Sequence, residues 1–158
     1  MLDTIFAIKL VHMIAMAVML GTWTCIALFM FYAYRSRNTS VAAVTALFAV
    51  RAELTLMVPA VALQPLAGLP LAVAIGARLD EYWLELSEAI YAAVVVAWLA
   101  NLIIELRIRK LTQEAAVNSL PLPDSYRRLF RLWSLFSVLG LAGMVAVMAL
   151  MIWQPHWY

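Results

Sequence analysis

Long apolar segments separated by short polar stretches run along the whole chain. Four of them, at about residues 5–34, 42–77, 83–106 and 132–153, hold the roughly 20 helical residues that a hydrocarbon core of about 30 Å requires. They lack the alternation of apolar and polar residues that marks a membrane β-barrel. Since lipid offers the backbone no hydrogen-bond partner, each segment is expected to be a helix. The pattern predicts an all-α fold, a four-helix transmembrane bundle that takes up residues 1–158 as one integral membrane domain.

Prolines interrupt the second apolar segment, which reads VPAVALQPLAGLPLAVA. Pro59, Pro65 and Pro70 each remove a backbone donor and free a carbonyl one turn earlier, so the second helix is expected to be kinked. Gln64 lies beside the central break, and Gly68 permits the close approach of another helix. Broken helices of this kind line ligand sites in transporters, whereas prolines also occur in membrane helices as plain kinks. The pattern leaves both interpretations open.

Basic residues favour one side of the predicted membrane. They concentrate after the first and third spans, whereas the segment between the second and third spans has one arginine beside two acidic residues. Because basic residues mark the cytoplasmic face, both termini are expected on the outer, periplasmic side of a bacterial inner membrane. Residues 107–131 then form a cytoplasmic loop, in which Pro121 and Pro123 predict a helix break before Asp124. The basic residues of this side are Arg35, Arg37, Arg107, Arg109, Lys110, Arg127, Arg128 and Arg131.

Composition narrows the class of protein further. The chain is 66% hydrophobic and 13% charged, whereas soluble domains are about 25% charged. Its net charge of +2 is too small to indicate a nucleic-acid partner, so the expected environment is the lipid bilayer. The single cysteine, Cys25, excludes an internal disulfide and a CxxC motif. The first span lacks the basic start of a cleavable signal peptide and is too long for one, so we expect it to stay in the mature protein.

Two polar residues stand near the outer end of the first span. Lys9 and His12 share one helical face, and His12 falls about one turn deeper in the outer leaflet, where a polar side chain is a functional candidate. Glu85 and Glu88 enter the membrane from the same side on the third span. An unpaired charge at this depth is costly, so we expect at least one glutamate to neutralise Lys9. The four residues are predicted to form one polar layer.

His12 has a chemical and a structural interpretation. A buried neutral imidazole is a good axial ligand for haem iron, but His156, the other histidine, is expected at the surface. A haem at His12 then needs a different sixth ligand, five-coordinate iron or a site shared by two copies. The structural alternative is a histidine that hydrogen-bonds to a neighbouring helix. Methionines on the first and fourth spans similarly suit Cu(I) or adaptable packing.

Charged residues also occur near the inner boundary. Glu53 falls at the start of the second apolar run, where we expect it to pair with charges of the loops. Asn101 and Glu105 are four residues apart on the third span and approach the same level. Arg107 or Arg109 is the expected partner of Glu105.

Several segments resemble a bacterial family of uncharacterised four-span integral membrane proteins. They are KLVH and MLGTWTCIALFMFYAYRS, RAELTLMVPAVALQPLAGLPLA, RKLTQEA, and LPDSYRRLFRLWSLFSVLGLAG with MALMIWQP. The likeness covers nearly the whole chain, the QPLxG segment is its most specific part, and it implies the fold more than a function. More remotely, the KxxH opening is similar to HemJ-type protoporphyrinogen oxidases and copper-resistance D proteins. In the HemJ-type enzymes a first-helix histidine is associated with haem b, and His12 is the position that matches.

Three functions remain open from the sequence, and enzymatic activity is undecided. The first is a haem-b protein with a redox or electron-transfer role, in which His12 is the axial ligand and Lys9, Glu85 or Glu88 serves a propionate or a proton. The second is a cofactor-free accessory subunit of a larger membrane complex. The third is a transporter or channel that uses Gln64 and the broken second span. A homo-oligomer or a complex with other subunits is expected.

Overall fold

The protein is a bundle of long helices that form four rods. The structure is a computed structural model and describes residues 2–154. A short π-helical turn, η1, joins α2 to α3 without a loop, so these three elements make up one rod. No strand occurs among the described residues, and the predicted all-α four-helix fold is confirmed. In chain order the elements are α1 (Leu2–Ser36), α2 (Thr39–Ala52), η1 (Glu53–Met57), α3 (Val58–Ala74), α4 (Tyr82–Val117) and α5 (Asp124–Trp153).

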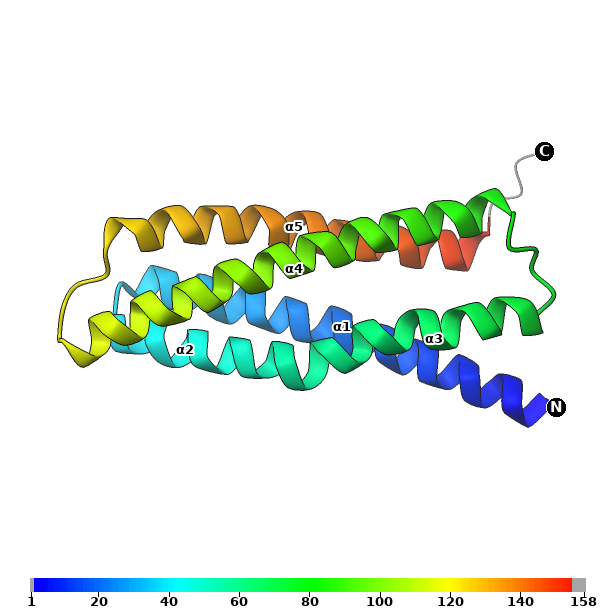
Figure 1. The fold of residues 1–158 in the computed structure, drawn as a ribbon, viewed down its shortest axis with the longest axis horizontal. Helices are drawn as coiled ribbons and strands as arrows, with labels where there is room; N and C mark the ends of the chain where they lie inside the picture. Colours follow the sequence, from blue (N-terminus) through cyan, green and yellow to red (C-terminus); the bar gives the residue numbers. More distant parts are fainter. Residues whose placement is uncertain (1, 155–158) are drawn as a thin grey trace.

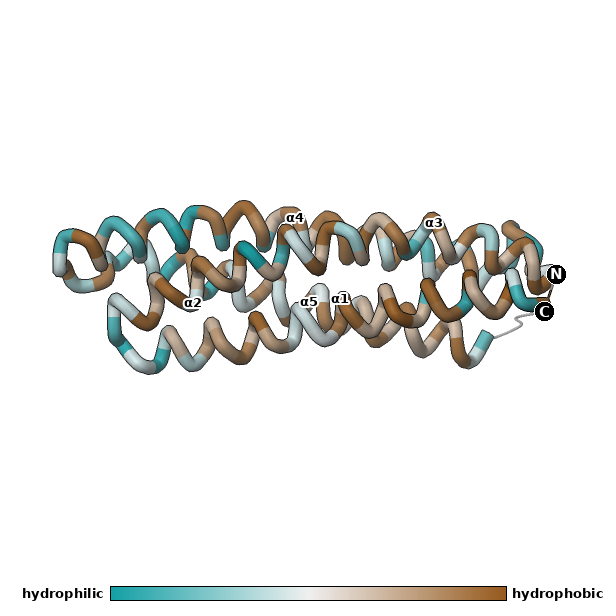
Figure 2. Tube along the Cα trace, turned by 90° about the horizontal axis from the view of Figure 1, so that it is seen from below, coloured by the Kyte–Doolittle hydropathy of each residue, from teal (hydrophilic) through white to brown (hydrophobic). Residues whose placement is uncertain are grey.

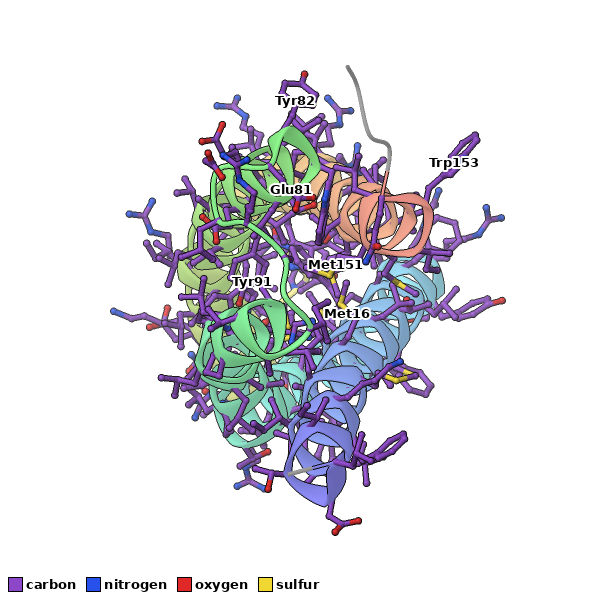
Figure 3. All side chains as sticks on the ribbon, turned by 90° about the vertical axis from the view of Figure 1, so that its right-hand side faces the viewer. Met16, Glu81, Tyr82, Tyr91, Met151 and Trp153 are labelled. Atoms are coloured by element: carbon purple, nitrogen blue, oxygen red, sulfur yellow. The ribbon has the colours of Figure 1, made fainter. Side chains whose placement is uncertain are left out.

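The rods run alternately up and down, and each packs against the next one in the chain. α1 packs on α2 and α3, α2 packs on α4, and α4 packs on α5, while α1 and α5 close the ring. Viewed along the bundle, the rods occupy four corners, with α1 and α4 on a diagonal (Figure 3). The two described ends of the chain lie at one end of the bundle, opposite the α1–α2 and α4–α5 connections (Figure 1).

Local sequence explains where the helices begin and end. Asn38 caps α2, because its side-chain oxygen accepts the backbone N–H groups of Ser40 and Val41 at 2.9 and 3.2 Å. α5 begins at Asp124, immediately after the proline pair, which confirms the predicted break. The expected loop over 107–131 is shorter than predicted, since α4 continues to Val117 and α5 already covers 124–131. Charged side chains do not stop a helix that points them outward, whereas prolines do.

The rods are longer than a membrane is thick. α4 has 36 residues and extends about 54 Å at 1.5 Å per residue, against about 30 Å of hydrocarbon. All four rods are long and apolar enough to cross a membrane. Hydrophilic residues gather at the end with the two connections, which we call the Arg-rich end, and apolar residues dominate the remaining length (Figure 2). The Arg-rich end therefore projects beyond the apolar band. It carries Arg35, Arg37, Arg107, Arg109, Lys110, Arg127, Arg128 and Arg131.

The middle of the bundle is filled by large side chains that pack onto glycines. Trp23 is completely buried, and its indole lies against Gly140 of α5 so closely that a Cβ there would be 2.0 Å from Cη2. Val94 of α4 packs on Gly143 in the same way, since a Cβ at Gly143 would lie 2.5 Å from Val94 Cγ2. Methionines fill the space around Trp23, which is the adaptable packing that thioethers favour. Those buried in this cluster are Met19, Met57 and Met144.

Candidate functional site

His12 joins α1 to α3 through a reciprocal pair of hydrogen bonds with Gln64. His12 Nδ1 lies 3.2 Å from the Gln64 carbonyl oxygen, which can only accept, so this nitrogen carries the proton. Gln64 Nε2 donates in turn to the His12 carbonyl oxygen at 3.4 Å. The half-buried imidazole rests on Gly68, where a Cβ would come within 2.9 Å of Cε1. Two candidates that the sequence treated separately, the histidine and the proline-broken helix, therefore form one contact.

The other members of the predicted outer layer do not gather around His12. Lys9, Glu85 and Glu88 are all exposed. None of the three takes part in an ion pair within residues 2–154, so the expected neutralisation of Lys9 by a glutamate does not occur. The reason is the order of the rods, since Lys9 is on α1 and the glutamates are on α4, at diagonal corners of the bundle.

His12 is the residue of the predicted site that could bind a haem. An iron-bound histidine usually donates its other ring N–H to a carbonyl or carboxylate, and the His12 contact with Gln64 has this form and leaves Nε2 as an acceptor. No group of three or more His, Cys, Asp or Glu side chains among the described residues is arranged to hold a metal ion. His156 lies outside the described residues. The residues expected for a propionate are exposed elsewhere, so His12 is the one member of the predicted set that suits a haem here.

The predicted helix break at Gln64, Pro65 and Gly68 is absent, since α3 runs without interruption from Val58 to Ala74, and a neighbouring helix supplies the donor that Pro65 lacks. Pro65 has no N–H, so the carbonyl of Val61, one turn earlier, loses its helical donor. The Tyr91 hydroxyl of α4 donates to this oxygen at 2.7 Å. A cross-helix hydrogen bond therefore replaces the missing helical one, and the Val61 carbonyl is satisfied within the protein. The π-helical turn Glu53–Met57 lies just before this region, and turns of this type are frequent at functional sites.

Two carboxyl groups lie inside the bundle, deeper from solvent than His12. Glu53, the first residue of η1, is 2% exposed, and Glu105 of α4 is 1% exposed. Trp98 Nε1 donates to Glu53 Oε2 at 2.5 Å, and the Trp133 side chain is in hydrogen-bonding contact with Glu105. The two carboxyls are close enough for the charge on one to act on the other. We call these two residues the carboxyl pair.

Two buried acceptors on α4 lack a donor within residues 2–154. They are Glu105 Oε1 and Asn101 Oδ1. The other end of the Asn101 side chain is committed, since Nδ2 donates to the hydroxyl of Ser137 on α5 at 2.7 Å. Asn101 and Glu105 are four residues apart on α4, so both open oxygens belong to one helical face, one turn apart. A buried acceptor without a donor is costly, and such groups call for a proton, water or ion.

The expected ion pairs of these carboxyls are absent, and the prediction that loop charges neutralise them was wrong. The ion pairs of residues 2–154 are Arg78–Asp80 and Lys110–Glu114, both at the surface. Arg107 is exposed, because two residues further along a helix turn the side chain through about 200°. Arg109 is on the same side of α4 as Glu105, one turn nearer the Arg-rich end, and is partly exposed without an ion pair to Glu105.

Residues 6–155 match a family model described as a predicted integral membrane protein (DUF2269). The chain belongs to this family. No curated protein and no solved structure matches it. The description agrees with four membrane-crossing rods and names no activity.

One signal in the DUF2269 sequence could have shown that Glu105 points inward. The buried positions of α4 recur every three or four residues, and Asn101 and Glu105 belong to that series. The same face continues mostly with apolar residues, so its polar members point into the bundle. The series includes Trp98, Asn101, Glu105, Ile108, Thr112 and Ala115.

Proposed function

We propose that this membrane protein moves ions across the bilayer and that the carboxyl pair is its protonatable centre. The observation that carries the proposal is Glu105, an acid buried to 1% exposure in a membrane bundle, with one oxygen unpartnered and no basic side chain paired to it. Charging a carboxyl in such surroundings costs several kcal/mol, as an order of magnitude. An apolar residue in a purely structural role would avoid this cost. Acidic residues inside membrane bundles mark proton relays and ion pathways.

The position of the pair along the bundle supports a route through the protein. Glu53 stands 14 residues after the start of α2 at Thr39, which is about 21 Å from the Arg-rich end at 1.5 Å per residue. From the pair toward the termini, the interior offers further polar groups: Asn101 with Ser137, then the Tyr91 hydroxyl, then Gln64 with His12. Polar side chains that pass protons or ions need such steps within an apolar bundle.

The orientation follows from the same charge distribution that the sequence displays. The Arg-rich end carries eight basic residues, whereas the opposite connection carries Arg78 beside Asp80 and Glu81. We infer that the Arg-rich end faces the cytoplasm of a bacterial inner membrane and that the described ends of the chain face outward. We expect a protease to cut the α4–α5 connection, residues 118–123, in oriented vesicles. Cleavage should occur only when the protease can reach the cytoplasmic face.

Proton flux into liposomes tests the main proposal. Purified protein is placed in vesicles that contain a pH-sensitive dye, and a pH gradient is applied with valinomycin and potassium to prevent a counter-potential. Wild-type vesicles are expected to lose the gradient at least tenfold faster than Glu105→Gln vesicles, since Gln keeps the shape but cannot exchange a proton. Glu114→Gln is the matched control, because Glu114 is an exposed glutamate of the same helix. Equal rates for wild type and Glu105→Gln, or for wild type and empty vesicles, would refute the proposal.

Haem b is a second candidate on one observation, the Nδ1 hydrogen bond of His12, which leaves Nε2 for a ligand. A haem would supply one-electron chemistry, and His12 would hold it as an axial ligand. The optical spectrum of the purified protein, with pyridine haemochrome analysis, tests this. A Soret band that disappears in His12→Ala supports the candidate, and a colourless, fully folded protein removes it.

A further inference from the structure

We propose that the carboxyl pair and Asn101 bind a monovalent alkali cation in exchange for a proton. The inference rests on the proposed function and names the second ion of that site. It starts from the two buried oxygens that lack a donor, Glu105 Oε1 and Asn101 Oδ1. They lie on one face of α4, and Glu53 approaches from η1 on the neighbouring rod.

The donor set selects the class of ligand. The two open groups are oxygens, one of the Glu105 carboxyl and one of the Asn101 amide, and the Glu53 carboxyl adds further oxygen. Oxygen-only sets suit hard cations such as Na⁺, K⁺, Mg²⁺ and Ca²⁺. The Asn101 amide nitrogen donates to the Ser137 hydroxyl, which leaves the amide oxygen open. This oxygen is available as a neutral ligand.

Charge selects a monovalent ion over a divalent one. Two carboxyls that are buried together in an apolar bundle do not both ionise, because like charges at close range repel each other and burial penalises both. With one proton retained, the pair carries a single negative charge, which one monovalent cation balances. A divalent ion would need both protons removed, or would leave a net positive charge in the core.

The exchange is balanced in charge and in atoms. In one state the pair holds two protons and is neutral. In the other it holds one proton and one cation, with the cation bound by Glu105, Asn101 and Glu53, and is again neutral. Each cation that binds therefore releases one proton, and neither state leaves an uncompensated charge among the helices. Since no other reactant is needed, the site is suited to one-for-one exchange.

Proton release on cation addition tests the inference. The purified full-length protein, in detergent and weak buffer near neutral pH, is titrated with NaCl, LiCl, KCl, choline chloride or MgCl₂ while a soluble pH indicator is followed. An alkali chloride is expected to release close to one proton per chain, and choline chloride at equal ionic strength none. In Glu105→Gln the release should vanish. In Asn101→Leu the alkali-ion midpoint should rise about tenfold while the chain still takes up protons after an acid pulse.

Controls separate the inference from a general loss of structure and from the main proposal. Ser87→Ala removes another buried hydroxyl of α4, one that bonds to its own helix at Trp83, and should titrate as wild type. If Asn101→Leu does not fold, the titration of the unmodified chain still decides the matter. No alkali-specific release, or release by MgCl₂ alone, overturns the inference. Proton flux that depends on Glu105 and does not respond to alkali cations would overturn this inference and leave the proposed function in place. Absence of Glu105-dependent flux would overturn the proposed function itself.

Discussion

Replacing Gly140 by alanine should destabilise the bundle, because the new methyl group meets a side chain that has no room to move. A Cβ at Gly140 would lie 2.0 Å from Cη2 and 2.3 Å from Cζ2 of Trp23. Carbon atoms in contact are normally about 3.5–4.0 Å apart, so the indole or α5 must shift by roughly 1.5 Å. Trp23 is 0% exposed and is surrounded by core side chains, so the shift disturbs them as well.

The magnitude follows from two opposing contributions. Overpacking of a filled core costs about 1–3 kcal/mol, and the rigid neighbour places Gly140→Ala near the upper value. Alanine gains about 1 kcal/mol over glycine in helix propensity, so the expected net loss in the free energy of unfolding is about 2 kcal/mol. Gly21→Ala is the matched control, since no atom lies within 4 Å of its added Cβ. It should gain up to about 1 kcal/mol, which separates two identical chemical changes by about 3 kcal/mol.

Reversible unfolding in mixed micelles, with the mole fraction of SDS as the denaturing variable, measures both variants. Trp23→Phe removes the ring atoms that the methyl group meets, so Gly140→Ala should cost markedly less in that background. Equal stability of the two alanine variants would refute the close contact of α1 with α5. So would an unchanged cost in the Trp23→Phe background.

Three further predictions concern α3 at Pro65, the lipid-facing surface and the α3–α4 connection. Tyr91→Phe should lower the free energy of unfolding in micelles by about 1 kcal/mol, because it removes the donor to the Val61 carbonyl. The loss should be clearly smaller in a Pro65→Ala chain, whose restored backbone N–H supplies that donor, and equal losses would contradict the role of the hydroxyl. Cys25 is exposed and borders an apolar groove of about 730 Å³ between α1 and α2. Because a maleimide reacts with the thiolate, which hydrocarbon suppresses, Cys25 should stay unlabelled in intact vesicles and become labelled after unfolding in SDS. Labelling in intact vesicles would place this groove in water. The Arg78 guanidinium lowers the pKa of the Asp80 carboxyl through hydrogen bonds and charge. The small stabilisation by this pair is therefore present at neutral pH and is lost as the pH falls through the lowered pKa. NMR titration of Asp80 should find its midpoint below the usual range, and a midpoint at or above that range would exclude the pair.

The rods and their ends follow directly from sequence rules that act over short distances. Apolar runs of sufficient length must become helices in lipid, and the proline pair before Asp124 must end one. The prolines of the second span predicted a helix break that does not occur, because the helix continues through Pro65 and Pro70. The irregular winding lies before them, in the π-helical turn Glu53–Met57, which the hydrophobic pattern did not indicate.

The site was less predictable than the helices. A sequence indicates which face of a helix a residue lies on, but not which residues of other helices it contacts. His12 and Gln64 were each identified as candidates, and only the packing of α1 on α3 brings them together. Lys9 and Glu85 share a level in the membrane, and the diagonal position of their rods keeps them apart. Glu105 has a basic residue two positions away in the sequence, and the helix points that residue outward. Which rods are neighbours depends on the global packing, which no local pattern contains.

The π-helical turn has a consequence for how the second rod can vary. A π-turn is what remains in an α-helix when one residue too many is accommodated within it. Each residue of a π-turn rotates the chain by less than the 100° of an α-helix, so Glu53–Met57 hold the extra residue while α3 keeps nearly the phase of α2. Removing one residue there can be absorbed by a return to regular winding, with Gln64 still on the buried face. Removing one residue from the regular part of α2 would instead rotate everything beyond it by about 100°. The second rod can therefore lose a residue at this turn and keep its interior face.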